Sequence, residues 1–236
     1  MLNLIGVVLC RDGDDPDAVR DAWTQTCLPE VRRLPGLRYC AWNRAADRFA
    51  RDTDPKHPAL PVAGFVQCIL DPGPGVAELG ASPAGQGLRA AEAKVTAMTM
   101  VLEVEQRVVI SPPRDLPRAV KTMSIIRRAD GYSHEAFLYE WRVVHVPLVQ
   151  AVKPIRGYRQ HLVTGRWRNW SEAVDDTAFP FDGAVELWYE SPDVLSALRD
   201  SAAGQATAAH AAKTSARVEK YQIGSVTEWF AGSSRS

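Results

Sequence analysis

The sequence predicts an α+β protein in which two tandem copies of one βαββαβ module pack sheet-to-sheet as a single barrel within the chain. Three observations lead to this prediction: a repeat that runs through the whole sequence, the same order of strand-like and helix-like segments in the two copies, and a proline-rich junction between them. With 236 residues, of which 46% are hydrophobic, the chain is long enough for each copy to bury a core.

The repeat consists of identical residues at a nearly constant separation. Early in the two copies the separation is 118 positions, in the pairs Gly13–Gly131, Trp23–Trp141 and Pro29–Pro147. After one inserted residue it becomes 119, in the pairs Tyr39–Tyr158, Pro61–Pro180, Gly64–Gly183 and Lys94–Lys213, and in the tripeptides Ala84-Gly85-Gln86 and Ala203-Gly204-Gln205. Such an ordered series indicates an internal duplication.

The C-terminal copy shows the order of elements most clearly. Runs rich in β-branched and aromatic residues predict strands, and segments with helical spacing predict helices, the first of them capped by Ser133. In chain order we expect a strand at 121–128, a helix from 133 to 148, strands at 155–163 and 181–189, a helix within 191–213, and a strand at 218–230. The order β-α-β-β-α-β is typical of the ferredoxin-like unit, a four-stranded antiparallel sheet with both helices on one face.

A single such unit leaves the second face of its sheet bare, and a second copy in the same chain supplies a cover for it. The junction, residues 111–117, contains three prolines, which favour an extended connector. We therefore expect an N-terminal module at residues 1–112 and a C-terminal module at residues 113–236.

Charge and composition narrow the classes of partner. Twenty-eight basic residues balance twenty-eight acidic ones, so no net field attracts nucleic acid or an anionic membrane. No apolar stretch is long enough to cross a bilayer. The four cysteines show neither metal-site nor redox spacing, which is the pattern of reduced thiols in a cytoplasmic protein. The glycine-rich stretches lack phosphate-binding and dinucleotide-binding spacing, so we expect no cofactor and no metal.

The most specific motif is Trp-x-x-x-His-x-Pro-Leu at residues 141–148, within the run 137–148 and followed by Gly157-Tyr158 and by the segment 181–188. This pattern resembles the EthD family of dimeric α+β barrel proteins. The resemblance covers nearly all of residues 119–230 and, through the repeat, extends more weakly over residues 3–110. It implies cofactor-free lyases, isomerases, dehydratases or decarboxylases, and related barrels include cofactor-independent monooxygenases. Cys27 stands where the second copy has His145, which implies a single working site in the chain.

The candidate catalytic group is His145. Because residues four apart share one face of a helix, His145 is expected beside Trp141, with Phe137 one turn earlier, and Pro147 is expected to end the helix. An imidazole with an ordinary pKa near about 6.5 exchanges protons near neutral pH. The indole would form a pocket wall for an aromatic ring. The alternative is that His145 is a core histidine without a catalytic role.

Two strands carry further candidates. Tyr158 is expected to donate a hydrogen bond to a substrate oxygen or, alternatively, to pack as Tyr39 does. His161, on the opposite face of the same strand, is a weaker candidate for substrate binding. Glu186, on the next strand, is expected to orient His145 or act as a second acid, and its alternative is a solvated carboxylate. His210, in the alanine-rich helix, is expected to be exposed.

A long connection between about residues 165 and 180 contains Trp167 and Trp170. Loops of this length often form lids, so these two side chains are expected to close over an apolar ligand or, alternatively, to pack the loop against the barrel.

The leading functional hypothesis is a cofactor-free lyase or isomerase that acts on a small cyclic, aromatic or polyketide-like molecule, with His145 as general acid and base. The first alternative is a cofactor-free monooxygenase for the same substrates. The second is a non-catalytic protein that binds an apolar ligand or serves in assembly, and a homodimer of chains is compatible with each hypothesis.

Overall fold

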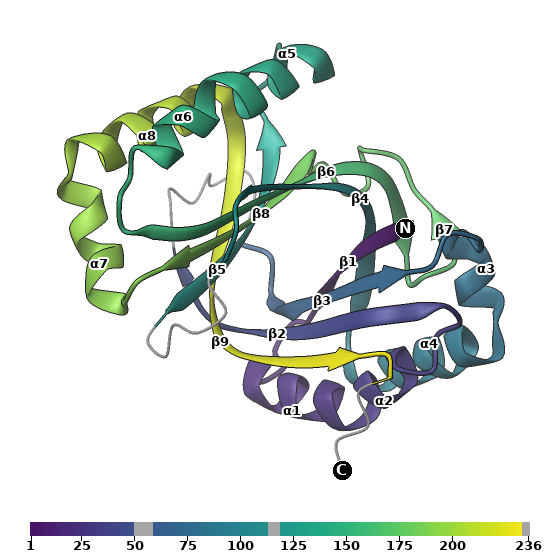
Figure 1. Ribbon diagram of the computed structural model, residues 1–236. Coiled ribbons are helices and arrows are strands. Elements are labelled where there is room, and N and C mark those ends of the chain that lie inside the picture. The colour runs from purple at the N-terminus through teal and green to yellow at the C-terminus, as the bar shows by residue number, and fades with distance from the viewer. Residues whose placement is uncertain (50–58, 113–118, 233–236) are drawn as a thin grey trace.

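The computed structural model describes residues 1–49, 59–112 and 119–232 (Figure 1). The prolines Pro113 and Pro117 of the expected junction lie outside these ranges. We refer to the elements β1 to β4 as the N-terminal half and to β5 to β9 as the C-terminal half.

The N-terminal half has the order β-α-β-β-α-β, with each helical segment split in two. Its elements are β1 (Leu2–Leu9), α1 (Pro16–Thr26), α2 (Leu28–Val31), β2 (Leu37–Phe49), β3 (Val62–Leu70), α3 (Val76–Ala81), α4 (Pro83–Val95) and β4 (Met98–Ile110). Both α1 and α4 begin with a proline, which is tolerated there because the first helical N–H has no intrahelical acceptor.

The C-terminal half repeats this order with one short additional strand. Its elements are β5 (Val120–Arg128), α5 (His134–Tyr139), the π-helical turn η1 (Glu140–Val144), α6 (His145–Gln150), β6 (Ile155–Arg168), β7 (Glu172–Ala173), β8 (Gly183–Tyr189), α7 (Pro192–Ala197), the 3₁₀ turn η2 (Leu198–Asp200), α8 (Ala202–Thr214) and β9 (Ser215–Phe230). Ser133 caps α5 as expected, since its Oγ accepts from the N–H of Ala136 at 3.1 Å. The expected helix within 191–213 is instead interrupted by η2, and Ser201 caps a new helix there by accepting from Gly204.

The strands form one antiparallel sheet that closes on itself. Their order is β4-β1-β3-β2-β9-β5-β8-β6-β7, and β4 also pairs with β6, so eight long strands complete a barrel while β7 extends one edge. The two halves meet at two pairs of strands, β2 with β9 and β4 with β6, which we call the seams. The seams are alike, because β6 is the equivalent of β2 in the C-terminal half and β9 is the equivalent of β4. The α+β class is thus confirmed, and the two halves are joined by hydrogen bonds along their edges in addition to facing each other.

Strand alternation sends side chains either into the barrel or outward beneath the helices. The barrel interior holds an apolar core from both halves, which includes Phe65, Met100, Met123, Phe181 and Tyr221. The helices lie outside the barrel, α1 to α4 against one side and α5 to α8 against the other (Figure 1). Each helix layer covers a further apolar cluster on the outer face of its own half.

Strand pairing corrects one pair of the sequence repeat. Cys40 lies opposite Cys68, and Tyr158 lies opposite Leu187, which is the repeat equivalent of Cys68. Cys40 is therefore the counterpart of Tyr158, and the separation of 118 positions persists into this strand. The expected equivalence of Tyr39 and Tyr158 is wrong: Tyr39 belongs to the other face of β2, where its hydroxyl donates to Glu228 at 2.6 Å.

Candidate active site

The segment α5-η1-α6 runs through the Trp-His motif with a π-helical turn in its middle. The backbone N–H of His145 donates to the carbonyl of Glu140, five residues earlier, where an α-helix would use the residue four before. This turn lies just ahead of Pro147, whose ring would press on the carbonyl of Val143 in a regular helix. The expectation that Pro147 ends the helix is wrong, because α6 continues to Gln150.

The π-helical turn places Glu140 and His145 so that both reach a histidine of α8. The ring nitrogens His145 Nδ1 and His210 Nδ1 are 3.2 Å apart, and His210 Nε2 lies 2.9 Å from Glu140 Oε2. The side chains of His210 and Glu140 are only 11% and 21% exposed, so the contact is largely shielded from water. The expectation that His210 is exposed is therefore wrong. We call Glu140, His210 and His145 the Glu-His-His relay.

Hydrogen-bond polarity determines what the relay can do. An ionised carboxylate only accepts, so Glu140 requires a proton on His210 Nε2. A neutral His210 then has a lone pair on Nδ1, which accepts the Nδ1–H of His145. This assignment leaves a lone pair on Nε2 of His145, the tautomer that a general base requires.

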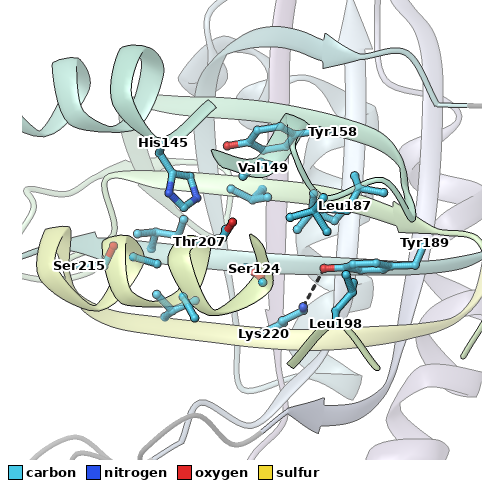
Figure 2. Close-up of a pocket in the computed structure, with 18 of the residues that line it drawn as sticks. Ser124, His145, Val149, Tyr158, Leu187, Tyr189, Leu198, Thr207, Ser215 and Lys220 are labelled. Carbon is cyan, nitrogen blue, oxygen red and sulfur yellow. Dashed lines mark hydrogen bonds between the residues drawn. The ribbon is translucent and has the colours of Figure 1, made fainter. Parts of the chain in front are cut away.

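A cavity of about 770 Å³ lies between the helices α6 to α8 and the outer face of the C-terminal half of the sheet. This volume is typical of sites for small molecules. Figure 2 shows His145 at one end of the cavity and the pair Tyr189 and Lys220 at the other, with aliphatic side chains between them. The walls are mostly apolar, and the polar lining side chains are those of Ser124, Trp141, His145, Tyr158, Tyr189, Gln205, Thr207, Thr214, Ser215, Lys220 and Gln222.

The structure brings together three predicted site residues at this cavity: His145, Trp141 and Tyr158. Phe137 lies behind them, buried and stacked on Trp141 with ring centroids 5.4 Å apart, so it supports the wall without lining it. Burial raises the pKa of Tyr158 above its ordinary value, although hydrogen bonds from Gln160 and Trp141 oppose this. Tyr158 therefore stays a neutral phenol that can donate a hydrogen bond but does not act as a base at neutral pH.

Glu186 and His161 lie on the opposite face of the sheet from the cavity. Val185 and Leu187 line the cavity, so the residue between them points into the barrel, where Glu186 Oε2 meets Lys121 Nζ at 2.6 Å and Glu186 Oε1 meets His161 Nε2 at 2.8 Å. The expectation that Glu186 orients His145 is wrong, because the sheet separates the two side chains, and His161 does not line this cavity.

Glu186 is nevertheless ionised. Burial alone raises its pKa, but the charge of Lys121, the hydrogen bond from His161 and the charge of Arg159 together outweigh burial and leave the pKa well below its ordinary value. Gln67 of the N-terminal half also donates to Glu186 Oε1 at 2.9 Å. This charged cluster connects the two halves inside the barrel.

Trp170 and Trp167 do not form a lid. The strand β6 extends to Arg168, and the following turn, with Asn169 and Trp170 both in the left-handed region, directs the indole of Trp170 into the core beneath the helices of the N-terminal half. There Trp170 is fully buried and donates from Nε1 to Glu92 Oε2 at 3.1 Å. Trp167 packs against the same core. The alternative, that these residues pack their segment onto the barrel, agrees with the structure.

Trp170 occupies the space that corresponds to the cavity. Its ring approaches Gly6, the repeat equivalent of the cavity residue Ser124, and a Cβ built on Gly6 would lie 3.8 Å from it. Its neighbours in this core include Trp23 and Cys27, the counterparts of Trp141 and His145. Burial raises the pKa of the Cys27 thiol to about 12, so Cys27 cannot serve as the base that His145 is in the other half, and Trp170 fills the corresponding space.

Sequence reasoning missed Glu140, His210 and Lys220. Glu140 stands directly before the motif tryptophan, but only the π-helical turn brings it within reach of His210. The spacing of Thr207, His210 and Thr214 along α8 is a weak signal for a polar stripe that faces α6. Among the described residues, no group of three or more His, Cys, Asp or Glu side chains is arranged to hold a metal ion.

The fold and the site define an α+β protein with an eight-stranded antiparallel barrel and a helix-covered cavity with a histidine relay. Residues 129–215, within the C-terminal half, match the family model of the EthD domain. None of the described helices is both long enough and apolar enough to pass through a membrane.

Solved structures share the fold along nearly the whole chain. An anthrone oxidase-like protein superposes with a TM-score of 0.64 at 10% identity, covering 96% of this chain and 92% of that one. A "putative monooxygenase" from Fusobacterium nucleatum has a TM-score of 0.56 at 9% identity, covering 98% and 94% of the two chains. A protein of the same description from Lactobacillus acidophilus has a TM-score of 0.50 at 8% identity, covering 97% and 95%. At such identities the likeness is one of fold. The search of curated proteins found no match to this chain.

Proposed function

We propose that this protein is an acid–base enzyme that removes a proton from a small, apolar, cyclic substrate, with His145 as the base. The observation that carries the proposal is the Glu-His-His relay at the cavity wall, because hydrogen bonding from His145 to His210 and on to Glu140 favours the tautomer with a lone pair on Nε2 of His145. A base held in this way contributes about 10²–10⁴ to the rate of a proton transfer.

The remaining groups of the cavity fit such a substrate. Trp141 presents an indole for stacking, and Tyr158 is a neutral donor that is 1% exposed. Aliphatic side chains of β8 and α6 exclude water, which strengthens every electrostatic interaction inside. An aromatic or polyketide-like ring system matches these walls in shape and polarity.

After loss of the proton, the electron pair on the substrate has two fates. In the first, the carbanion or phenolate reacts with dioxygen, as in a monooxygenase: a methylene compound and O₂ give the ketone and water. The full-length likeness to an anthrone oxidase-like protein and to two proteins described as monooxygenases supports this fate. We therefore place the monooxygenase first.

In the second fate the electron pair expels a leaving group or the proton returns elsewhere, as in a lyase or isomerase. The paired imidazoles support it, because the proton gained by His145 stays within the relay and can be given back. A third possibility is that the cavity binds an apolar ligand without changing it.

One probe separates these outcomes. Anthrone has an acidic methylene next to a ring system, and its oxidation to anthraquinone consumes one O₂ and releases one water. Under nitrogen, deuterium exchange at the methylene measures proton abstraction alone; in air, an oxygen electrode and the absorbance of anthraquinone measure oxidation. Exchange with oxygen uptake supports the monooxygenase, and exchange without uptake supports the lyase or isomerase.

The variant for this experiment is His145→Ala, and the control is His134→Ala, an exposed histidine at the start of α5. We expect His145→Ala to lower the rate of exchange by about 10²-fold or more and His134→Ala to leave it unchanged. Equal exchange by His145→Ala and the wild type would contradict the proposed base. Tight binding of anthrone without exchange would favour the non-catalytic alternative.

We further propose that residues 1–112 and 113–236 are two ferredoxin-like modules that correspond to the two subunits of a dimeric α+β barrel joined in one chain. The matching seams β2–β9 and β4–β6 support this arrangement. A homodimer of whole chains stays a prediction, which light scattering on the purified protein checks.

A further inference from the structure

The cavity has a positively charged end opposite its base. The described residues that line it include no aspartate and no glutamate, and Lys220 is the lysine among them. Lys220 Nζ donates to the hydroxyl of Tyr189 at 3.0 Å and lies 5.0 Å from the centre of its ring. Tyr189 is 3% exposed and Lys220 is partly buried, so the contact is partly shielded from water.

We propose that Tyr189 and Lys220 form an oxyanion-binding site, and that the substrate is an apolar ring compound with an enolate, phenolate or carboxylate oxygen at the end away from His145. This inference rests on the proposed function, because it supplies the partner for the negative charge that proton abstraction creates. The shared chemistry is an anionic oxygen on a flat apolar body.

Strand alternation directs both groups at the cavity. On β9, Val218, Lys220 and Gln222 line the cavity, whereas Tyr221, between them, belongs to the barrel interior. On β8, Tyr189 follows Leu187 on the cavity side. Both side chains therefore already face the cavity, as preorganised stabilisation of a developing charge requires.

Lys220 and Tyr189 have no polar equivalents at the corresponding positions of the N-terminal half. Ser124 pairs with Lys220, and its repeat equivalent Gly6 pairs with Val101. Val120 pairs with Tyr189, and its repeat equivalent Leu2 pairs with Leu70. The repeat equivalents of Lys220 and Tyr189 are thus the buried aliphatic residues Val101 and Leu70.

His145, Tyr189 and Lys220 therefore occur together in one half, and the described residues at the equivalent positions of the other half are Cys27, Leu70 and Val101. The half that lacks His145 has Cys27 in its place, and the equivalent space is filled by Trp170. A lysine that served only to solvate the surface would not be expected to occur in the same half as the base and the open cavity. This joint occurrence supports one shared chemistry for the two ends of the cavity.

The hydrogen-bond inventory gives each group a role. The Tyr189 oxygen accepts from Lys220, so its own hydroxyl hydrogen is left to donate toward a ligand, and the neighbouring ammonium polarises that O–H. When His145 Nε2 takes a proton from a ring carbon, the C–H bond breaks and its electron pair moves through the ring to the oxygen. The negative charge then develops beside Tyr189 and Lys220. Removal of one such donor typically costs about 10²–10³ in rate.

Binding of two probes tests the site without any need for turnover. The probes are 2-naphthoate and its uncharged counterpart 2-naphthamide, and calorimetry on the full chain measures both dissociation constants. We expect the wild type to bind 2-naphthoate about tenfold more tightly than 2-naphthamide, and Lys220→Met to lose this preference while its affinity for 2-naphthamide changes less than about threefold. Tyr189→Phe should reduce the preference in part.

Two further variants make the test decisive. Lys220→Arg keeps the positive charge and is expected to keep the preference, so it carries the test if Lys220→Met fails to fold. Lys153→Met removes an exposed lysine outside the cavity and should behave as the wild type. The proposal is overturned if the wild type shows no preference for 2-naphthoate over 2-naphthamide. It is also overturned if Lys220→Met keeps the wild-type preference.

This result is separable from the proposed function. His145→Ala should keep the preference for 2-naphthoate while losing deuterium exchange. If instead His145→Ala keeps exchange, the proposed base is wrong whatever the anion preference of the cavity. If exchange depends on His145 but the preference is absent, the base stands and the oxyanion site does not.

Discussion

His145 and His210 meet through their Nδ1 atoms at 3.2 Å although 65 positions separate them in the chain. Two histidines that both carried a proton on Nδ1 would repel each other at this contact, so one of them must accept. When His210 is neutral, Glu140 selects the acceptor, because it holds the single ring proton of His210 on Nε2 and leaves Nδ1 to accept. A carboxylate that touches neither cavity nor substrate thereby sets the protonation pattern of the residue that does.

Glu140→Gln tests this positioning role. The amide can donate as well as accept, so it no longer requires a proton on His210 Nε2, and the tautomer of His145 becomes mixed. We expect the rate of deuterium exchange to fall roughly tenfold to a hundredfold, part of the contribution of a general base. Long-range ¹H–¹⁵N spectra should show His145 with its proton on Nδ1 in the wild type and on both nitrogens in the variant.

Glu135→Gln serves as the matched control, because Glu135 is an exposed glutamate in the first turn of α5. It should keep the wild-type rate and tautomer. A loss of exchange in Glu140→Gln without any change of tautomer would assign Glu140 a structural role instead.

Trp170 fills the core of the N-terminal half, and its removal should create a cavity there. We expect Trp170→Ala to lower the free energy of unfolding by about 3–5 kcal/mol, as is typical when a buried aromatic side chain is truncated. The residual space is flat, apolar and closed by the carboxyl group of Glu92, so free indole should bind it and restore part of the lost stability. Urea unfolding with and without indole measures both effects.

Benzofuran provides the control ligand, because it has the shape of indole but an oxygen in place of the N–H. It should restore less stability than indole if the hydrogen bond to Glu92 contributes. Equal rescue by the two ligands would show that shape alone matters, and rescue of the wild type by indole would place the binding elsewhere.

Glu92 should make stability fall as pH rises. Burial raises its pKa to about 7, although Thr99, Trp23 and Trp170 oppose this by hydrogen bonding. Between the ordinary glutamate pKa and about 7, the folded state holds a proton that the unfolded state has released, so folding is favoured at the acidic end and loses stability toward neutral pH. We expect the unfolding free energy of the wild type, measured relative to that of Glu92→Gln, to decrease by about 2 kcal/mol from pH 5 to pH 7.

The comparison with Glu92→Gln removes every contribution to the pH dependence that the two proteins share. Glu186 does not interfere, because its lowered pKa keeps it ionised in both states across this range. A difference that stays constant with pH would mean that Glu92 is ionised in the folded protein.

The sequence predicted the α+β class and the strand order because both depend on local patterns that the repeat presents twice. It also predicted that Trp141 and His145 lie side by side, because residues four apart share one face of a helix, whereas for Tyr158 it left substrate binding and packing both open. The relay was not predictable in the same way. It depends on a π-helical turn and on contact between α6 and α8, and neither has a local signature in the residues 140–145 or 202–214.

Two expectations failed for a common reason. Chemical type suggested that Glu186 orients His145 and that Trp170 closes over a ligand, with packing onto the barrel as the alternative for Trp170, whereas a sheet has two faces and this barrel has two layers of helices. The alternation of β8 directs Glu186 to the interior, and the extension of β6 to Arg168 carries Trp170 across to the N-terminal half. In a strand whose two faces are both buried, the sequence pattern does not show which face a polar residue occupies. That face is determined by the register of the strand, which depends on its pairing with strands distant in sequence.

The separation of the barrel interior from the cavity leads to a last prediction, which concerns Lys121 and Glu186. Lys121 Nζ lies 2.6 Å from a carboxylate that is fully buried, and removal of one partner leaves a charge without its main compensation. Lys121→Met should lower the free energy of unfolding by about 3–5 kcal/mol, whereas Lys121→Met combined with Glu186→Leu should recover much of the loss.

Neither variant should change the affinity for 2-naphthamide, because both side chains lie on the interior face of strands whose other face lines the cavity. Calorimetry at a temperature where all variants are folded checks this point, and urea unfolding checks stability. An affinity that drops in Lys121→Met and returns in the double variant would show that the interior cluster communicates with the cavity through the sheet. An affinity that stays constant while stability changes by several kcal/mol would establish that the charged cluster joins the two halves and that the chemistry belongs to the outer face alone.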